Sequence, residues 1–78
     1  MKKIEIYSTP TCHFCHLAKD YFDANKIAYT DYNVATDIEK RKEMLSKSGQ
    51  MGVPVIVIDD KDIVVGFDQG RLQALLGI

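Results

Sequence analysis

Apolar and polar residues follow distinct periods along the chain, and these periods predict its strands. Residues 3–7 alternate between polar and apolar side chains, and residues 27–34 are rich in aromatic and β-branched side chains, so both segments are predicted strands. Residues 55–58 form an unbroken apolar run, as expected of a strand covered on both faces. The acidic turn that follows leads into residues 63–65, which predicts an antiparallel hairpin.

The segments between these strands have helical patterns. After Phe14, apolar residues recur at helical spacing, at Leu17, Ala18, Tyr21 and Phe22. Asn25-Lys26 should end this helix. Thr36 and Glu39 form a predicted capping box that begins a charged second helix, and Gly49 should end it. Asp68 is the predicted N-cap of a short last helix.

The resulting order, β-α-β-α-β-β-α, predicts an α/β fold with a four-stranded mixed sheet flanked by helices. The first β-α-β unit should be a right-handed crossover between parallel strands, to which the hairpin adds antiparallel ones. The chain has 78 residues and contains no repeat, linker or low-complexity tract. We therefore expect residues 1–78 to form a single domain.

Composition narrows the classes of partner. The net charge is −1 and the charges are mixed in sign, so neither nucleic acid nor an anionic membrane is an expected partner. The longest apolar run, residues 53–58, is far below the length of a membrane span, and residues 1–7 are too polar for a signal peptide. These features predict a protein of the cytoplasm, where two cysteines are expected to be catalytic or metal-bound. We expect it to be a monomer.

Both cysteines and both histidines lie between Cys12 and His16, a stretch that fits three chemistries. It is a C-x-x-C dithiol, a C-x-x-C-H haem attachment pattern, and a row of metal ligands. Haem needs a second axial ligand, for which Met44 and Met51 are candidates. A zinc site needs a second pair of Cys or His ligands, which the chain lacks. Dithiol chemistry is therefore favoured and no metal is predicted, with an iron–sulfur cluster or haem held at Cys12 and Cys15 as the alternative.

The spacing of the two cysteines suits disulfide exchange. Cys12 lies where a loop enters a helix N-terminus, whose free N–H groups and dipole favour a thiolate. Cys15 follows about one helical turn later, so the two Cα atoms should lie about 5–6 Å apart, within the range for a disulfide. One thiol can therefore attack a substrate disulfide and the other can resolve the mixed disulfide.

Three motifs in this order resemble those of the glutaredoxins, small members of the thioredoxin-fold superfamily. They are the dithiol with the residues after it, 12–19, then Gly52-Val53-Pro54 before the apolar strand, and Val65-Gly66-Phe67-Asp68 after the hairpin. The resemblance extends nearly from end to end and implies a thioredoxin-like fold. It also implies that Cys12 attacks and Cys15 resolves.

The resemblance assigns further residues to substrate binding. It implies a cis Val53-Pro54 bond with Pro54 facing the dithiol, and a Val53 backbone that pairs with the substrate like an added strand. The substrate or glutathione site would be completed by Gly66, Phe67 and Asp68.

The chain departs from the glutaredoxin pattern at several positions. His13 and Phe14 replace the Pro and Tyr of the usual C-P-Y-C and are expected to tune the thiol pKa or the reduction potential. Thr9 stands where many glutaredoxins carry Lys or Arg. Residues 65–67 also resemble the redoxins that serve ribonucleotide reductase and are reduced by thioredoxin reductase.

Together these features predict a dithiol thiol–disulfide oxidoreductase that reduces protein or glutathione mixed disulfides and holds no bound cofactor. Its electron donor would be either glutathione as a cosubstrate or thioredoxin reductase.

Overall fold

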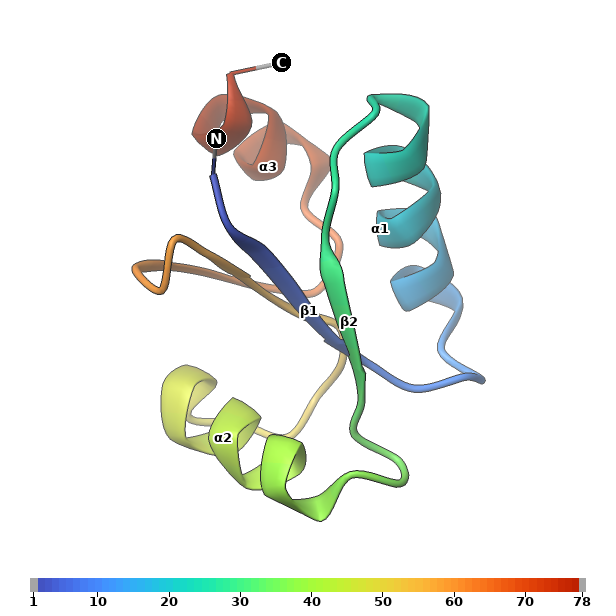
Figure 1. Cartoon of the computed structure of the whole chain (residues 1–78), viewed down its shortest axis with the longest axis vertical. Coiled ribbons are helices and arrows are strands. Elements are labelled where there is room, and N and C mark those ends of the chain that lie inside the picture. Colours follow the sequence, from blue (N-terminus) through green and yellow to red (C-terminus); the bar gives the residue numbers. More distant parts are fainter. Residues whose placement is uncertain (1, 78) are drawn as a thin grey trace.

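A computed structural model describes residues 2–77, which form seven helices and strands in the predicted order (Figure 1). The elements are β1 (Ile4–Ser8), α1 (His13–Ala24), β2 (Thr30–Asn33), α2 (Ile38–Ser48), β3 (Val55–Ile58), β4 (Asp62–Val65) and α3 (Gln69–Leu76). None of the helices within residues 2–77 is both long enough and apolar enough to cross a membrane.

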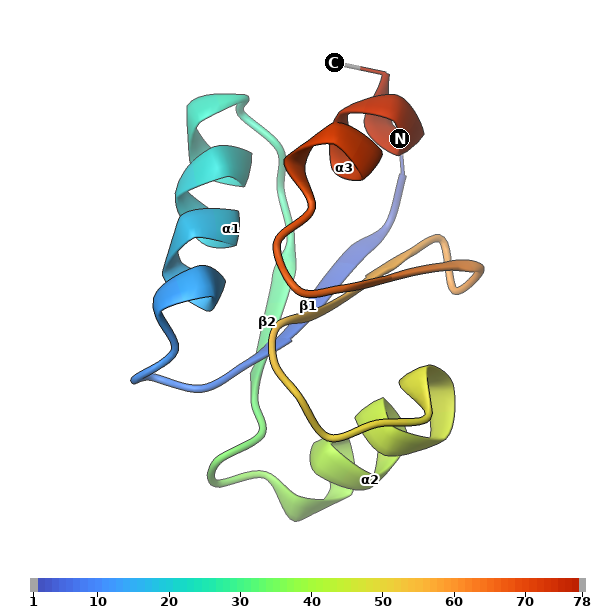
Figure 2. The same ribbon diagram turned by 180° about the vertical axis from the view of Figure 1, so that it is seen from behind.

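The four strands make one mixed sheet in the order β2-β1-β3-β4. β1 and β2 are parallel, whereas β3 is antiparallel to both β1 and β4. Helices α1 and α3 lie on one face of this sheet and α2 lies on the other, as the two opposite views show (Figures 1 and 2). The predicted α/β architecture, with its parallel β-α-β unit and antiparallel hairpin, is confirmed.

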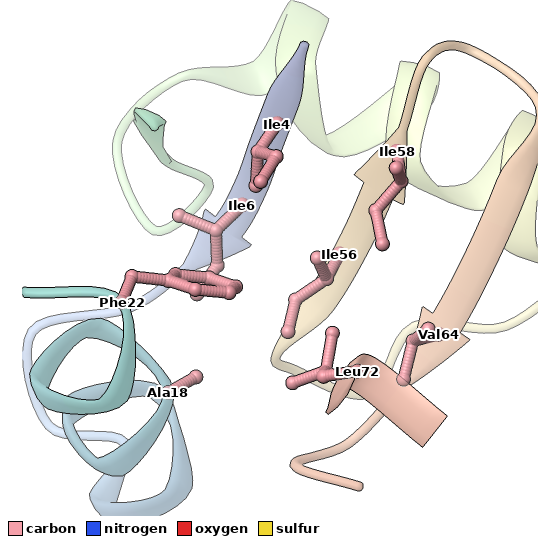
Figure 3. Close-up of a cluster of buried hydrophobic side chains, with 8 residues drawn as sticks. All are labelled: Ile4, Ile6, Ala18, Phe22, Ile56, Ile58, Val64 and Leu72. Atoms are coloured by element: carbon pink, nitrogen blue, oxygen red, sulfur yellow. The ribbon is translucent and has the colours of Figure 1, made fainter. Parts of the chain in front are cut away.

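The larger core lies between the sheet and helices α1 and α3 (Figure 3). Its buried side chains come from three strands and two helices, and are Ile4, Ile6, Ala18, Phe22, Ile56, Ile58, Val64 and Leu72. Ala18 and Phe22 are four residues apart on α1, so they lie on the same face of the helix and fix it against the sheet.

The second core lies under α2 and contains Tyr7, Val34, Met44, Val55 and Val57. Because β1 and β3 are inner strands covered on both faces, all nine of their residues are buried. The alternation in residues 3–7 therefore separates two buried faces, and even the charged Glu5 is only 3% exposed.

Two details of the prediction are wrong. The N-cap of α2 is Asp37, whose Oδ1 accepts a hydrogen bond from the Lys40 N–H at 3.1 Å. The side chain of Thr36 instead donates to the Asn33 carbonyl in the preceding turn, so there is no capping box. The second strand is also shorter than residues 27–34. β1 begins at Ile4 and Glu5 is paired with Thr30, so the residues before position 29 have no partner strand.

Other predicted ends are confirmed. Gly49 ends α2 with a left-handed φ of 72°, and its N–H donates to the Leu45 carbonyl, an arrangement that glycine favours. Asn25 is the C-cap of α1 and Asp68 is the N-cap of α3.

Candidate dithiol site

Strand register brings the three predicted motifs to one edge of the sheet. Tyr7 near the end of β1 pairs with Val55 at the start of β3, and Val55 pairs with Val65 at the end of β4. The dithiol loop, the residues before β3 and the residues after β4 therefore emerge from the same edge. A hydrogen bond of 2.7 Å from the Gly66 N–H to the Pro54 carbonyl joins two of these segments directly.

Cys12 is the N-cap of α1. Its backbone is extended, with φ −84° and ψ 113°, and its Sγ accepts a hydrogen bond from the Cys15 N–H at 3.1 Å. This N–H is one of the free donors at a helix start, and sulfur here takes the place that an oxygen acceptor usually holds. The same donor would face a thiolate at Cys12 in the reduced protein.

The two cysteines form a disulfide, with their Cα atoms 5.2 Å apart, as the spacing predicts. Their exposure differs. Cys12 is partly exposed, whereas Cys15 faces the interior with 0% of its surface exposed. Of the two cysteines, only Cys12 has exposed surface that a partner molecule could approach.

The Val53-Pro54 peptide bond is cis, as the resemblance implies. Pro54 is buried and Val53 is partly exposed, so the residue expected to pair with a substrate backbone remains accessible. Gly66 has a φ of 80°, a left-handed conformation that favours glycine over any other residue.

The third motif has two structural roles in the described residues. The Asp68 carboxylate accepts a hydrogen bond of 3.1 Å from the Arg71 N–H at the start of α3. The Phe67 ring packs edge-on against Tyr21 of α1, with 5.8 Å between the ring centroids. The assignment of both residues to substrate binding stays a prediction.

The two residues between the cysteines point outward. His13 and Phe14 contact each other edge-to-face at 5.4 Å, and Phe14 is 57% exposed. Met51, which precedes the Val53-Pro54 segment at the same edge of the sheet, is 51% exposed. The surface at this edge therefore includes large apolar side chains.

The sequence did not indicate two sets of contacts beside the dithiol. The Nε2 atom of His16 lies 2.8 Å from the Pro10 carbonyl oxygen in the loop before Cys12. In addition, Ser8 donates to Asp31 at 2.6 Å, and Asp31 forms an ion pair with Lys19 of α1 at 2.7 Å. Both sets join residues distant from each other or separated by a turn, so no local pattern could reveal them.

A polar cluster lies under α2, on the face of the sheet opposite α1. The Tyr7 hydroxyl donates to Glu43 at 2.5 Å, and Lys40 and Lys47 lie 3.2 Å and 3.4 Å from the same carboxylate. Burial raises the pKa of Tyr7, and the Tyr7 hydrogen bond, with help from the two lysines, lowers the pKa of Glu43 to about 2. Glu43 is therefore ionised at neutral pH and ties α2 to β1.

Within residues 2–77, no three His, Cys, Asp or Glu side chains are grouped in a way that could hold a metal ion. The hypothesis of an iron–sulfur cluster or haem stays a prediction, which visible absorption and bound iron in the purified protein would test.

Comparison with known proteins decides the family. The sequence model named Glutaredoxin matches residues 4–63, most of the chain. The chain belongs to the glutaredoxin family. A glutaredoxin-like 8.6 kDa protein from the rubredoxin operon of Clostridium pasteurianum, itself uncharacterised, is 48% identical over 94% of this chain and 96% of its own length.

Solved structures agree with this glutaredoxin assignment. The thioredoxin-like protein BC3987 superimposes with a TM-score of 0.86 at 34% identity, covering 94% of this chain and 99% of its own. NrdH-redoxin from Escherichia coli, described as a glutaredoxin-like protein with a thioredoxin-like activity profile, has a TM-score of 0.80 at 25% identity. That match covers 94% of this chain and 93% of the other. The chain is thus a glutaredoxin-like redox protein with a thioredoxin-like fold.

Proposed function

We propose that this protein is a dithiol thiol–disulfide oxidoreductase of the cytoplasm that reduces disulfides in proteins or mixed disulfides with glutathione. Cys12 is the attacking cysteine and Cys15 the resolving one. The protein acts as a monomer and needs no bound cofactor.

The observation that carries this proposal is the unequal exposure of the two bonded cysteines. Cys12 is partly exposed, whereas Cys15, which is bonded to it, is fully buried. The Cys15 N–H aimed at the Cys12 sulfur favours the thiolate at the position from which attack must come.

The steps follow from this arrangement. The Cys12 thiolate attacks one sulfur of the substrate disulfide, forming a mixed disulfide and releasing the other substrate sulfur as a thiolate that takes up a proton. Cys15 then loses its proton and attacks the Cys12 sulfur. The Cys12–Cys15 disulfide forms and the second substrate thiol leaves, so two electrons pass from the protein to the substrate.

Two serine variants test the order of attack. We expect Cys12→Ser to lose reduction of a protein disulfide such as that of insulin, by at least about a hundred-fold, because no accessible thiolate remains. Cys15→Ser should instead accumulate a mixed disulfide, visible as a mass adduct on Cys12. Adducts that form on Cys15 in the Cys12→Ser variant, with turnover retained, would show that the roles are reversed.

A second candidate concerns the electron donor, which we propose to be thioredoxin reductase in place of glutathione. The structural similarity to NrdH-redoxin supports this choice. The surface beside the dithiol also supports it. Thr9 provides no positive charge to bind a glutathione carboxylate. The exposed Phe14 and Met51 instead offer apolar contacts to a protein donor. In the glutathione alternative, Val53, Pro54, Gly66 and Asp68 would hold the tripeptide.

The donors are compared directly with one disulfide substrate. Turnover supported by NADPH and thioredoxin reductase should exceed turnover with glutathione and glutathione reductase by about ten-fold or more, as expected when one charge-assisted hydrogen bond to glutathione is missing. Thr9→Lys should raise the glutathione-dependent rate. Equal or faster turnover with glutathione in the wild type would contradict this second candidate and leave the dithiol mechanism intact.

A further inference from the structure

His16 lies one helical turn after Cys12, and its side chain returns to the loop that delivers Cys12 to the helix. The ring atom Nε2 is 2.8 Å from the Pro10 carbonyl oxygen. A carbonyl oxygen only accepts hydrogen bonds, so Nε2 must carry the proton and act as the donor. Both residues are exposed, which means that packing does not hold the ring in place.

The loop has few other connections to the helix. A backbone hydrogen bond of 3.3 Å, from the Cys12 N–H to the Thr9 carbonyl, closes the turn. The first hydrogen bond of the helix runs from the His16 N–H to the Cys12 carbonyl and is also 3.3 Å long. Both are long for N–H···O bonds. Pro10 has no N–H to contribute. The hydrogen bond from the His16 imidazole to Pro10 is therefore shorter than the two backbone hydrogen bonds that join the turn, Cys12 and α1.

The conformation of this turn determines what Cys12 can do. Its sulfur meets the Cys15 N–H because the Cys12 backbone is extended at the N-cap, and the chain enters that conformation directly from the turn. If the turn loosens, Cys12 spends less time as the N-cap, and its thiolate loses the N–H donor and the favourable end of the helix dipole.

We propose that His16 is a positioning residue for the attacking cysteine, acting through its hydrogen bond to Pro10. The proposal rests on the assignment of Cys12 as the attacking residue. His16 does not touch the substrate and transfers no proton. It keeps the turn in the conformation in which Cys12 caps α1.

Losing a positive charge at His16 would lower the reactivity of Cys12 much as losing the hydrogen bond to Pro10 would. Two different substitutions of His16 separate these effects. His16→Ala removes both the charge and the donor. His16→Gln removes the charge but places an amide N–H where Nε2 was, so it restores the hydrogen bond alone. Asn25→Ala is the matched control, because Asn25 also donates from α1 to a backbone carbonyl, that of Tyr21 at 2.8 Å, far along the helix from the dithiol.

The experiment measures the rate of alkylation of Cys12 by iodoacetamide between pH 5 and 9, with Cys15 replaced by Ser so that one thiol reacts. We expect His16→Ala to shift the midpoint of the pH profile upward and to lower the rate at pH 6 by about two- to five-fold, as for the loss of one exposed hydrogen bond. His16→Gln and Asn25→Ala should both match the unsubstituted protein. Disulfide reduction by the corresponding proteins with Cys15 intact should show the same order.

Two results would overturn the proposal: a His16→Ala profile that equals that of the control, or a Gln variant as slow as the Ala variant, which would indicate charge. Nitrogen NMR of the neutral imidazole provides an independent check, since a proton on Nδ1 would exclude the bond to Pro10. Failure of the proposed function would look different, because the unsubstituted protein would then reduce no disulfide while alkylation still reported on His16.

Discussion

Cys12 and Cys15 belong to one short motif, yet their surroundings suit them to different tasks. Cys12 is accessible and accepts an N–H bond at the helix start, whereas Cys15 is enclosed within the first turn of the helix. His13, between them, is the first residue of α1 and is exposed. A side chain there can change the electrostatics of the dithiol without altering the core.

We predict that His13→Pro makes the protein more reducing. The substitution removes a side chain that stabilises the Cys12 thiolate when protonated, so the reduced form becomes less stable and the reduction potential falls, by roughly 10–20 mV for an exposed group. Proline suits the first position of a helix, so α1 should remain intact. Equilibration with a glutathione redox buffer measures the potential.

His13→Gln is the control for this substitution, since it removes the charge and keeps the backbone N–H. The two variants should shift the potential in the same direction. An unchanged potential in both would remove His13 from the mechanism.

At the scale of elements, helix α2 is held to the sheet by a polar cluster as well as by Met44. Glu43 of α2 accepts the Tyr7 hydroxyl of β1, and Lys47 reaches both Glu43 and, at 3.5 Å, Asp60 in the hairpin turn. On the neighbouring strand Tyr32 donates to Glu5 at 2.8 Å, and Lys40 lies over the Tyr32 ring. α2 is thus connected to β1, β2 and the hairpin at once.

This cluster predicts a loss of stability in acid. The Tyr7 hydrogen bond and the lysines hold the pKa of Glu43 at about 2, below its value in an unfolded chain, so its contribution is complete above about pH 4.5 and is lost as the pH falls towards 2. Because a third of the side chain is exposed, solvent screening limits the contribution to on the order of 1 kcal/mol. Urea unfolding measured from pH 6 to pH 2 should show the decline.

Glu43→Gln keeps an acceptor for Tyr7 and removes the charge. The variant should be less stable than the wild type at pH 6, with the difference shrinking towards pH 2. If the free energies of unfolding of the wild type and the variant fall in parallel from pH 6 to pH 2, Glu43 contributes nothing to the loss of stability in acid.

For the molecule as a whole, the fold could be predicted because its signals are local. The apolar run of β3 matched the observed strand, and Gly49 and Asp68 marked helix ends through their own backbone and side-chain chemistry. The N-cap of α2 lies one residue after the predicted Thr36, because Thr36 and Asp37 are both good caps and the turn before them decides which is used.

The site was predictable only in part. The dithiol, Val53-Pro54 and Gly66 carry recognisable motifs, and register alone places them at one edge. The burial of Glu5 could not be inferred, because an alternating strand does not reveal that a helix covers its polar face. The contact of His16 with Pro10 depends on the shape of a turn, which the sequence of the helix does not encode.

The two inner strands of the sheet have a consequence for the timing of backbone motions. β1 and β3 are each paired on both sides and are buried, so we expect their amide hydrogens to exchange with solvent only on global opening. β1 leads directly into the dithiol loop, and β3 begins directly after Pro54. The two halves of the site are therefore attached to the backbone that we expect to exchange most slowly, so a local opening of the turn at residues 9–12, when the His16 hydrogen bond breaks, need not disturb the sheet behind it.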